Sequence, residues 1–232
     1  MTNPAIEARN LSAGYGKQAV IRNINIVVNP GEVVALLGSN GAGKTTTMLS
    51  LAGELSPLEG EVLIDGKPTK APLHVRAKQG MSYVTEEKSV IMGLSTRDNL
   101  RVAKADVDEA LRLFPSLDKR ISVAGGSLSG GEQQMLTLAR ALGRHPKILL
   151  ADELSMGLAP LIVQRLLQAV REAADTRGTG VLLVEQHVRQ ALKYADRAYV
   201  MRRGVVELEG TAKELASRID DIEATYFAGA KA

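Results

Sequence analysis

The chain has 232 residues, of which 45% are hydrophobic and 24% charged, so it fits one globular domain and neither a disordered nor a fibrous class. Its formal net charge of +3 does not favour the clustered basic face expected of a nucleic-acid-binding protein. With 0 cysteines, disulfides, cysteine nucleophiles and zinc–cysteine sites are excluded.

Neither a signal peptide nor a membrane span is predicted. Residues 1–5 contain no basic stretch followed by an apolar core. The longest apolar runs, at residues 33–37 and 181–184, are far shorter than the about 20 residues that a spanning helix needs. We therefore expect that the chain does not cross a bilayer by itself.

The first part of the chain predicts short strands. They are expected at residues 6–11, 20–28, 33–37, 61–64 and 81–84. The second alternates apolar residues at Ile24, Ile26 and Val28, as a half-buried strand does. A helix is predicted from about Gly43 through Leu51, and Asp65-Gly66 is a hairpin turn signal.

A small helical insertion is predicted at about residues 93–127. Ser95 and Asp106 stand at N-cap positions, each with an acidic residue three positions later. Within the insertion, we expect Pro115 to close the stretch of apolar helix faces that ends at Phe114, because proline disrupts a helix interior.

The second half alternates helices and strands. Helices are predicted at residues 130–142, 161–174 and 188–194, strands at 148–151 and 181–184, and a hairpin at 198–208. This alternation predicts an α/β domain with a largely parallel core sheet.

A glycine-rich loop follows the strand at residues 33–37 and precedes a helix. Residues 38–45 match G-x-x-x-x-G-K-[ST], in which backbone N–H groups surround phosphate oxygens at a helix N-terminus. Lys44 is expected to contact the outer phosphates and Thr45 to give its hydroxyl to magnesium. The predicted phosphate-binding residues are Gly38, Ser39, Asn40, Gly41, Ala42, Gly43, Lys44, Thr45 and Thr46. The alternative, a glycine-rich turn that only matches the pattern, is disfavoured by this context.

Two acids end the apolar strand at residues 148–151. Carboxylates at the C-terminal end of a buried strand lie where ligands collect in open α/β sheets. Asp152 is expected to hold magnesium, and Glu153 to orient or deprotonate the water that attacks the γ-phosphate. An ordinary strand that ends in two solvated acids is the alternative, which the phosphate loop makes minor.

Residues 128–134 read LSGGEQQ, and here the chain resembles the ABC ATPase family, whose signature is LSGGQ or a close variant. The resemblance covers nearly the whole chain. It implies a P-loop NTPase (RecA-like) core with an antiparallel β-subdomain and a small helical subdomain inserted before the signature. Residues 1–232 then form a single domain, with its core at 1–92 and 128–232 and the helical subdomain at about 93–127.

The signature residues also predict a second anion-binding site. Ser129 and the amides of Gly130 and Gly131 start a helix, which makes a second anion site far in sequence from the first. This arrangement makes sense if two subunits pair head to tail, so that each nucleotide meets the phosphate loop of one and the signature of the other. A helix cap from Ser129 to Glu132 is the simpler explanation, and the two are compatible.

The resemblance implies roles for further residues. Tyr15 matches the aromatic residue that stacks on adenine, with a surface turn tyrosine as the alternative. Glu86 falls where the family has a magnesium-linking glutamine. Gln186 falls where it has a histidine that senses the γ-phosphate, and His187 is next to it. We favour Gln186 as the contact and expect His187 to start the following helix, although either residue is a catalytic candidate.

Other stretches compare the chain with particular members of this family. The family's Ala-Leu-Asp, in a loop that touches the opposite subunit, reads Gly157-Leu158-Ala159, so its aspartate is missing. Glu86 and residues 155–160 and 184–192 look like the shorter cassette subunit of branched-chain amino-acid importers. Residues 85–89 depart from that group's usual sequence.

The resemblance implies ATP hydrolysis with Mg²⁺, at the cytoplasmic face of the membrane as a peripheral subunit. The implied partners are integral membrane permease subunits, a second cassette (a copy or a sibling) and, indirectly, an extracytoplasmic solute-binding protein, but no nucleic acid.

Three alternatives stay open. The cassette could serve another small solute or lipid export. It could be a soluble ABC ATPase of translation or DNA maintenance, which a single phosphate loop and a short insertion disfavour. It could bind nucleotide without hydrolysis, which Lys44, Asp152 and Glu153 disfavour.

Overall fold

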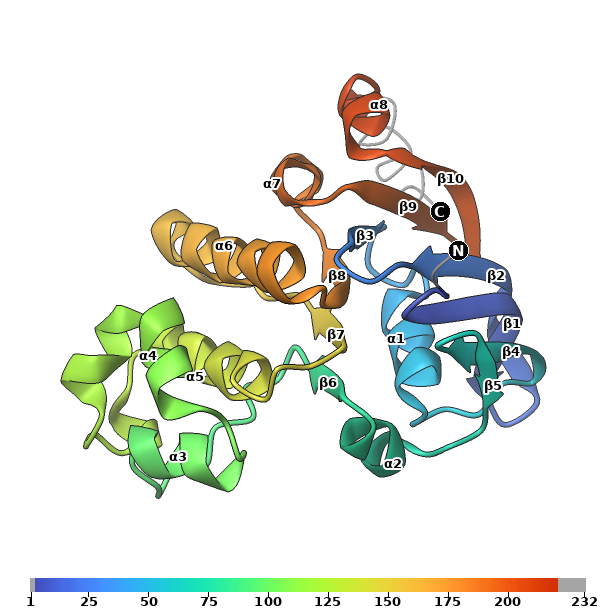
Figure 1. The fold of residues 1–232 in the computed structure, drawn as a ribbon. Helices are drawn as coiled ribbons and strands as arrows, with labels where there is room; N and C mark the ends of the chain where they lie inside the picture. The colour runs from blue at the N-terminus through green and yellow to red at the C-terminus, as the bar shows by residue number, and fades with distance from the viewer. Residues whose placement is uncertain (1–2, 221–232) are drawn as a thin grey trace.

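The computed structural model describes residues 3–220, so residues 1–2 and 221–232 of the predicted domain lie outside the described residues. Two sheets and the helices around them make up the described part (Figure 1). Among these residues, no helix is both long enough and apolar enough to span a membrane.

An antiparallel sheet of order β2-β1-β4-β5 carries the N-terminal part of the chain. Its strands are β1 (Ile6–Tyr15), β2 (Gln18–Val28), β4 (Glu59–Ile64) and β5 (Lys67–Thr69). Ile24 and Ile26 are buried while Asn25 between them is exposed, as the predicted alternation requires. Asp65 and Gly66, both with positive φ, form the predicted turn between β4 and β5.

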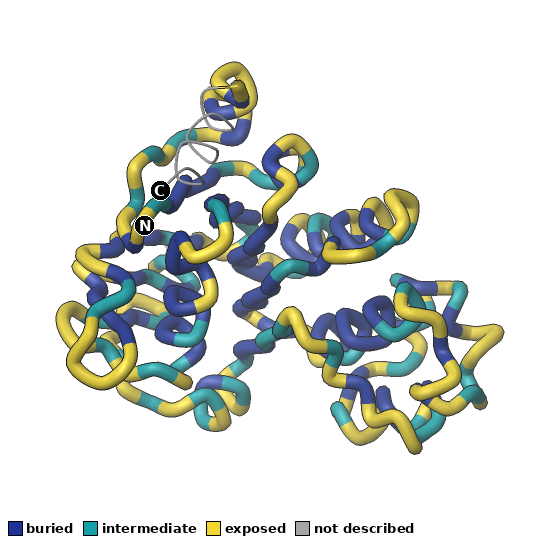
Figure 2. The backbone as a smooth tube through the Cα atoms, turned by 180° about the vertical axis from the view of Figure 1, so that it is seen from behind, coloured by how far each residue is buried: buried dark blue, intermediate teal, exposed yellow. Residues whose placement is uncertain are grey.

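The core sheet has the order β10-β9-β3-β8-β7-β6. Its strands are β3 (Val33–Leu37), β6 (Met81–Val84), β7 (Ile148–Asp152), β8 (Gly180–Glu185), β9 (Arg197–Arg202) and β10 (Val205–Thr211). All neighbours are parallel except β10 and β9. Successive residues Leu149 and Leu150 enter different apolar clusters, so both faces of the sheet are covered, and the core strands are apolar throughout. Figure 2 shows these strands buried and the outer loops exposed.

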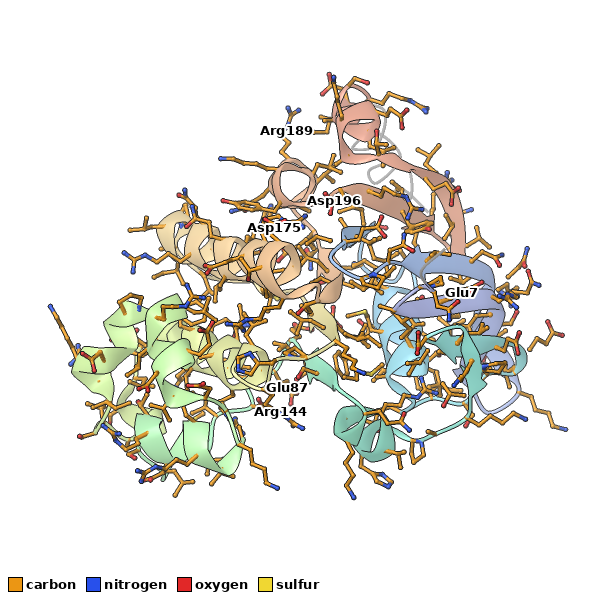
Figure 3. All side chains as sticks on the ribbon, in the orientation of Figure 1. Glu7, Glu87, Arg144, Asp175, Arg189 and Asp196 are labelled. Carbon is orange, nitrogen blue, oxygen red and sulfur yellow. The ribbon has the colours of Figure 1, made fainter. Side chains whose placement is uncertain are left out.

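The described residues also form helices, most of which pack around the core sheet. They are α1 (Lys44–Ala52), α2 (Leu73–Lys78), α3 (Thr96–Val102), α4 (Val107–Leu113), α5 (Gly130–Leu142), α6 (Pro160–Arg177), α7 (Val188–Tyr194) and α8 (Ala212–Ala216), with the 3₁₀ helices η1 (Pro115–Arg120) and η2 (Gly125–Ser127). On α6, Arg171 pairs with Asp175 and with Asp196, each at 2.7 Å. Both carboxylates are labelled in Figure 3, and this pairing fastens α6 to the turn before β9.

The predicted helical insertion contains α3 and α4, which pack on α5 away from the antiparallel sheet (Figure 1). Ser95 and Asp106 accept hydrogen bonds from backbone N–H groups three residues later, so both predicted caps are present. The helix α4 ends just before Pro115, as predicted, and Pro115 then opens the separate 3₁₀ helix η1, because proline is favoured at the first position of a helix.

The carboxyl ends of β3, β8, β7 and β6 lie along one edge of the core sheet, because these strands are parallel neighbours. The loop after β3 holds residues 38–43, and Gln186, Glu153 and Glu86 follow the other strands. The fold thus collects at one edge residues that are far apart in sequence.

Candidate functional site

The loop at residues 38–43 curls because of its glycines. Gly41 and Gly43 have left-handed backbones, with φ of 78° and 104°. A Cβ at Gly38 would lie 2.7 Å from the carbonyl oxygen of Met201. Side chains other than hydrogen are therefore disfavoured at these positions, and the loop keeps the conformation that turns successive N–H groups toward one anion.

Lys44 is held inside this loop and is only 5% exposed. Its Nζ donates to the carbonyl oxygens of Gly38, at 2.8 Å, and Ser39, at 3.2 Å. Glu153 Oε1 lies 3.7 Å from the same Nζ. Burial lowers the pKa of Lys44, and the charges of Glu153 and Asp152 oppose that shift. The ammonium is positioned at the centre of the predicted phosphate site.

A pocket of about 310 Å³ opens above the loop. It is lined by Val20, Asn40, Gly41, Gly43, Lys44, Thr45, Thr46, Glu86, Glu153, Met156 and Gln186. Most of these are residues that the sequence predicted for phosphate, magnesium or catalysis. Val20 and Met156 were not predicted as site residues, because an apolar side chain carries no chemical signal in a sequence.

Asp152 is the last residue of β7, directly before Glu153, and is 3% exposed. Its Oδ1 has no hydrogen-bond partner among the described residues. Burial, with repulsion from Glu153, raises the pKa of Asp152 to about 6, while Lys44 opposes the shift. An unpartnered buried carboxylate oxygen is a costly arrangement that a bound cation would relieve.

The donors at this position fit Mg²⁺, which prefers oxygen ligands and usually keeps several waters. Asp152 and Glu86 supply carboxylates, and Thr45, which interacts with Asp152, supplies an exposed hydroxyl. In residues 3–220 no group of three or more histidine, cysteine or acidic side chains is placed to hold a metal. A magnesium ion here would therefore depend on phosphate and water for its remaining ligands.

Glu153 sits in a tight turn with a left-handed backbone, φ 49°. Its N–H donates to the carbonyl oxygen of Val184 at 3.0 Å. Gln186 Nε2 donates to Glu153 Oε2 at 2.7 Å. His187 occupies the N-cap position of α7 and is not among the residues that line the pocket. The structure thus brings Gln186, and not His187, to Glu153.

Glu185 is a buried acid beside the site that the sequence reasoning missed. It is 2% exposed, and the hydroxyl of Ser155 donates to its Oε2. Burial raises the pKa of Glu185 to about 7; repulsion from Glu153 and Asp152 adds to this shift, and the hydrogen bonds from Ser155 oppose it. The available signal was a glutamate directly after the apolar run at residues 181–184.

Tyr15 lies at the end of β1 with 60% of its surface exposed. It is not among the residues that line the pocket, but it belongs to the same hairpin as Val20, which does. Because the ring is exposed, it leaves room for a stacking partner.

The signature residues lie elsewhere in the chain. The predicted cap is present, because Ser129 Oγ accepts from the N–H of Glu132 at 3.3 Å and Glu132 Oε2 accepts from the N–H of Ser129 at 2.8 Å. Gly130 and Gly131 form the first turn of α5. None of Ser129, Gly130 and Gly131 lines the phosphate-loop pocket. The two predicted anion sites are therefore separate within one chain.

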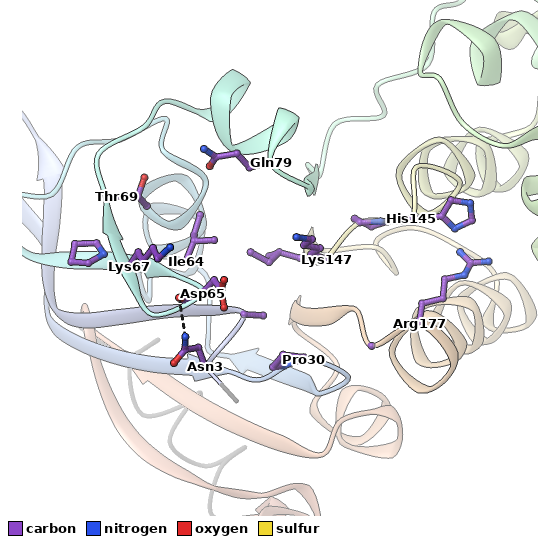
Figure 4. A pocket seen from close by; sticks show the side chains of 15 residues that line it. Asn3, Pro30, Ile64, Asp65, Lys67, Thr69, Gln79, His145, Lys147 and Arg177 are labelled. Atoms are coloured by element: carbon purple, nitrogen blue, oxygen red, sulfur yellow. Dashed lines mark hydrogen bonds between the residues drawn. The ribbon is translucent and has the colours of Figure 1, made fainter. Parts of the chain in front are cut away.

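A larger pocket, of about 720 Å³, lies at the opposite edge of the core sheet. Figure 4 shows its lining, which includes Asp65, Lys67, His145 and Lys147. It holds none of the predicted site residues and is formed near the start of β7. Its size alone does not make it the reactive site.

Comparison with known proteins gives consistent matches. A family model described as "ABC transporter" matches residues 21–155. The high-affinity branched-chain amino acid transport ATP-binding protein BraG of Pseudomonas aeruginosa is 37% identical, over 88% of this chain and 92% of that protein. The lipopolysaccharide export system ATP-binding protein LptB of Escherichia coli is 35% identical, over 90% and 92%. A solved structure described as the ATP binding subunit of an ABC transporter has a TM-score of 0.81 at 28% identity, over 96% and 99%.

Proposed function

Because this chain belongs to the ABC transporter family of ATP-binding subunits, which hydrolyse ATP to power transport, we propose that it drives the import of branched-chain or related amino acids. The observation that carries the proposal is the 37% identity to the amino-acid transport subunit BraG over most of both chains. The resemblance of residues 155–160 and 184–192 to that group supports it.

In this proposal ATP binds with its phosphates in the glycine loop. The amides of residues 38–43 and the N-terminus of α1 bind the phosphate oxygens. Lys44 exchanges the carbonyl oxygens of Gly38 and Ser39 for the outer phosphates. Tyr15 stacks on the adenine from the margin of the pocket.

Hydrolysis depends on Glu153 in this scheme. Its carboxylate orients the attacking water and accepts a proton from it. Gln186, which already donates to Glu153 at 2.7 Å, holds that carboxylate and contacts the γ-phosphate when ATP is bound. We assign no step to His187, which starts α7.

Asp152, Thr45 and Glu86 would hold Mg²⁺. When bound, the ion supplies positive charge that stabilises the negative charge developing on the phosphates. Asp152 is buried at the end of a strand, whereas Glu86 is exposed in the loop after β6.

Two cassettes pair head to tail in this proposal, so that Ser129, Gly130 and Gly131 of one complete the phosphate site of the other. Closure on ATP and reopening after hydrolysis drive the conformational change of the permease subunits. The subunit is placed at the cytoplasmic face of the membrane as a peripheral protein, and a solute-binding protein delivers the amino acid to the permease.

Uptake of radiolabelled leucine by the native host tests the proposed substrate class. Deletion of the gene should lower the uptake rate, and wild-type protein should restore it. The Glu153→Gln variant should not restore it, because transport requires hydrolysis. Unchanged leucine, isoleucine and valine uptake in the deletion strain would contradict amino-acid import.

Lipid export is a second candidate, favoured by the 35% identity to the lipopolysaccharide exporter subunit over 90% of the chain. The same deletion strain separates the two functions. Loss of surface lipopolysaccharide with normal leucine uptake would support lipid export in place of import.

A further inference from the structure

The last two residues of β8 and the residue directly after it contact the turn that carries Glu153. Val184 accepts the N–H of Glu153 through its carbonyl oxygen at 3.0 Å. Glu185 accepts the hydroxyl of Ser155 through Oε2. Gln186 donates to the carboxylate of Glu153 at 2.7 Å. The turn is thus held at the backbone N–H of Glu153, at the side chain of Ser155 and at the carboxylate of Glu153.

The turn needs such support. Glu153 has φ 49°, a left-handed conformation that a residue with a Cβ adopts only at an energetic cost. Such a conformation persists when the surrounding contacts over-determine it. The hydrogen bond from Ser155 to Glu185 lies two residues beyond Glu153 and fixes the exit of the turn.

Burying the carboxyl group of Glu185 costs free energy, which packing alone does not explain. Glu185 is 2% exposed, and its Oε1 has no hydrogen-bond partner among the described residues. Replacing both partners of a buried hydrogen bond by apolar groups of the same shape can be nearly neutral or stabilising. Burial raises the pKa of this carboxyl to about 7, so near neutral pH much of it is uncharged and can be matched in shape and hydrogen bonding by glutamine.

We infer that Glu185 is a positioning residue for ATP hydrolysis: through Ser155 it fixes the turn at residues 153–156 and thereby aims the carboxylate of Glu153 at the attacking water. The inference rests on the proposed role of Glu153. Glu185 itself does not line the phosphate-loop pocket, and in the described part of the chain its side chain forms no hydrogen bond with loop residues 38–43 or with Lys44.

Steady-state ATP turnover of the purified full chain with Mg²⁺ tests the inference. Glu185→Ala and Ser155→Ala should each lower kcat about 10- to 100-fold, since a small misplacement of a catalytic group has effects of this size. The KM for ATP should stay within about twofold of wild type, because the phosphate loop is unchanged. Combining both changes should lower kcat no further, because they break one interaction.

Two further variants separate positioning from a general structural effect. Glu185→Gln keeps the volume and an acceptor oxygen and should restore kcat to within about threefold of wild type. Thr179→Val removes another buried hydroxyl hydrogen bond, from Thr179 to Pro146 at 2.8 Å, just before the opposite end of β8. This control should keep kcat within about twofold of wild type.

A wild-type kcat in both Glu185→Ala and Ser155→Ala would overturn the inference. It would also be overturned if the two losses in kcat multiplied in the double variant, or if Glu185→Gln were as slow as Glu185→Ala. If Glu185→Ala does not fold, Ser155→Ala and Glu185→Gln decide the matter. Absence of turnover in the wild type would instead count against the proposed function, so the two failures are distinguishable.

Discussion

At the scale of single residues, Glu153 is the point where three parts of the chain meet. Lys44 from the glycine loop lies 3.7 Å from one of its carboxylate oxygens, and Gln186 from the end of β8 donates to the other. Its backbone is left-handed, which places the carboxylate over the pocket and not along the strand. The chemistry proposed for this site therefore depends on one strained turn.

Replacing this carboxylate is the most direct change at the residue scale. Glu153→Gln should lower ATP turnover at least about 100-fold, because it removes the group that activates water. ATP binding should persist, since Lys44 and the loop are intact. Phosphate release and equilibrium nucleotide binding measure the two effects. Glu209→Gln, an exposed change on β10, serves as the matched control, and normal turnover by Glu153→Gln would refute the assignment.

Glu185 predicts a pH dependence of stability. Burial raises its folded-state pKa from 4.5 to about 7, so between these values the folded protein holds a proton that the unfolded chain has released. Raising the pH makes the folded protein release this proton, which lowers the free energy of unfolding. From this group alone we expect a loss of about 1 kcal/mol between pH 6 and pH 8. Asp152, with a pKa of about 6, contributes mainly below that range.

Urea unfolding without nucleotide and with EDTA measures this dependence. Glu185→Gln should lose less stability than wild type between pH 6 and pH 8, because it has no proton to release. Equal slopes for the two proteins would show that Glu185 does not titrate in this window.

At the scale of elements, the sequence predicted the strands and helices that carry strong periodicity or caps. Residues 130–142 were predicted as a helix from Ser129, Glu132 and Gly143, and the structure confirms both ends. The strand at residues 81–84 was likewise confirmed. The short helices α2 and α8 were not predicted, because five or six residues give too little periodicity to recognise.

Site residues that belong to a local sequence motif could be predicted, whereas residues brought together only by packing could not. The glycine loop, Asp152 and Glu153 follow from local pattern, and the structure brings them to one edge of the sheet. Glu185 and Ser155 meet only because β7 and β8 are neighbours, although 30 residues separate them in sequence. Such a contact has no local signal.

The start of α6 lacks a side-chain cap. Ala159 occupies the N-cap position, where the family loop has its aspartate, and makes no capping hydrogen bond. Ala159→Asp should raise the free energy of unfolding by about 1 kcal/mol, because its carboxylate accepts from a first-turn N–H and favours the positive end of the helix dipole. Urea midpoints at constant m-value measure this, and Ala216→Asp, in the last turn of the short helix α8, is a control that should not stabilise. A lower midpoint for Ala159→Asp than for wild type would contradict the capping argument.

At the scale of the whole molecule, the two predicted anion sites face different surroundings. The phosphate loop opens a pocket that no signature residue lines, and Ser129 caps a helix in another part of the chain. Met156 and Leu161, after Glu153, are exposed at 59% and 62%. Together these features favour a nucleotide site completed by a second cassette, which is the central claim of the proposed mechanism.

Mixing two inactive variants tests this claim most directly. Lys44→Ala disables the phosphate loop and Ser129→Arg disables the signature, so neither protein alone should hydrolyse ATP. In a mixed head-to-tail dimer one site keeps an intact loop and an intact signature, and random pairing should restore up to about a quarter of wild-type turnover. A mixture as inactive as its two components, beside an active wild type, would show that the site does not form between two copies of this chain.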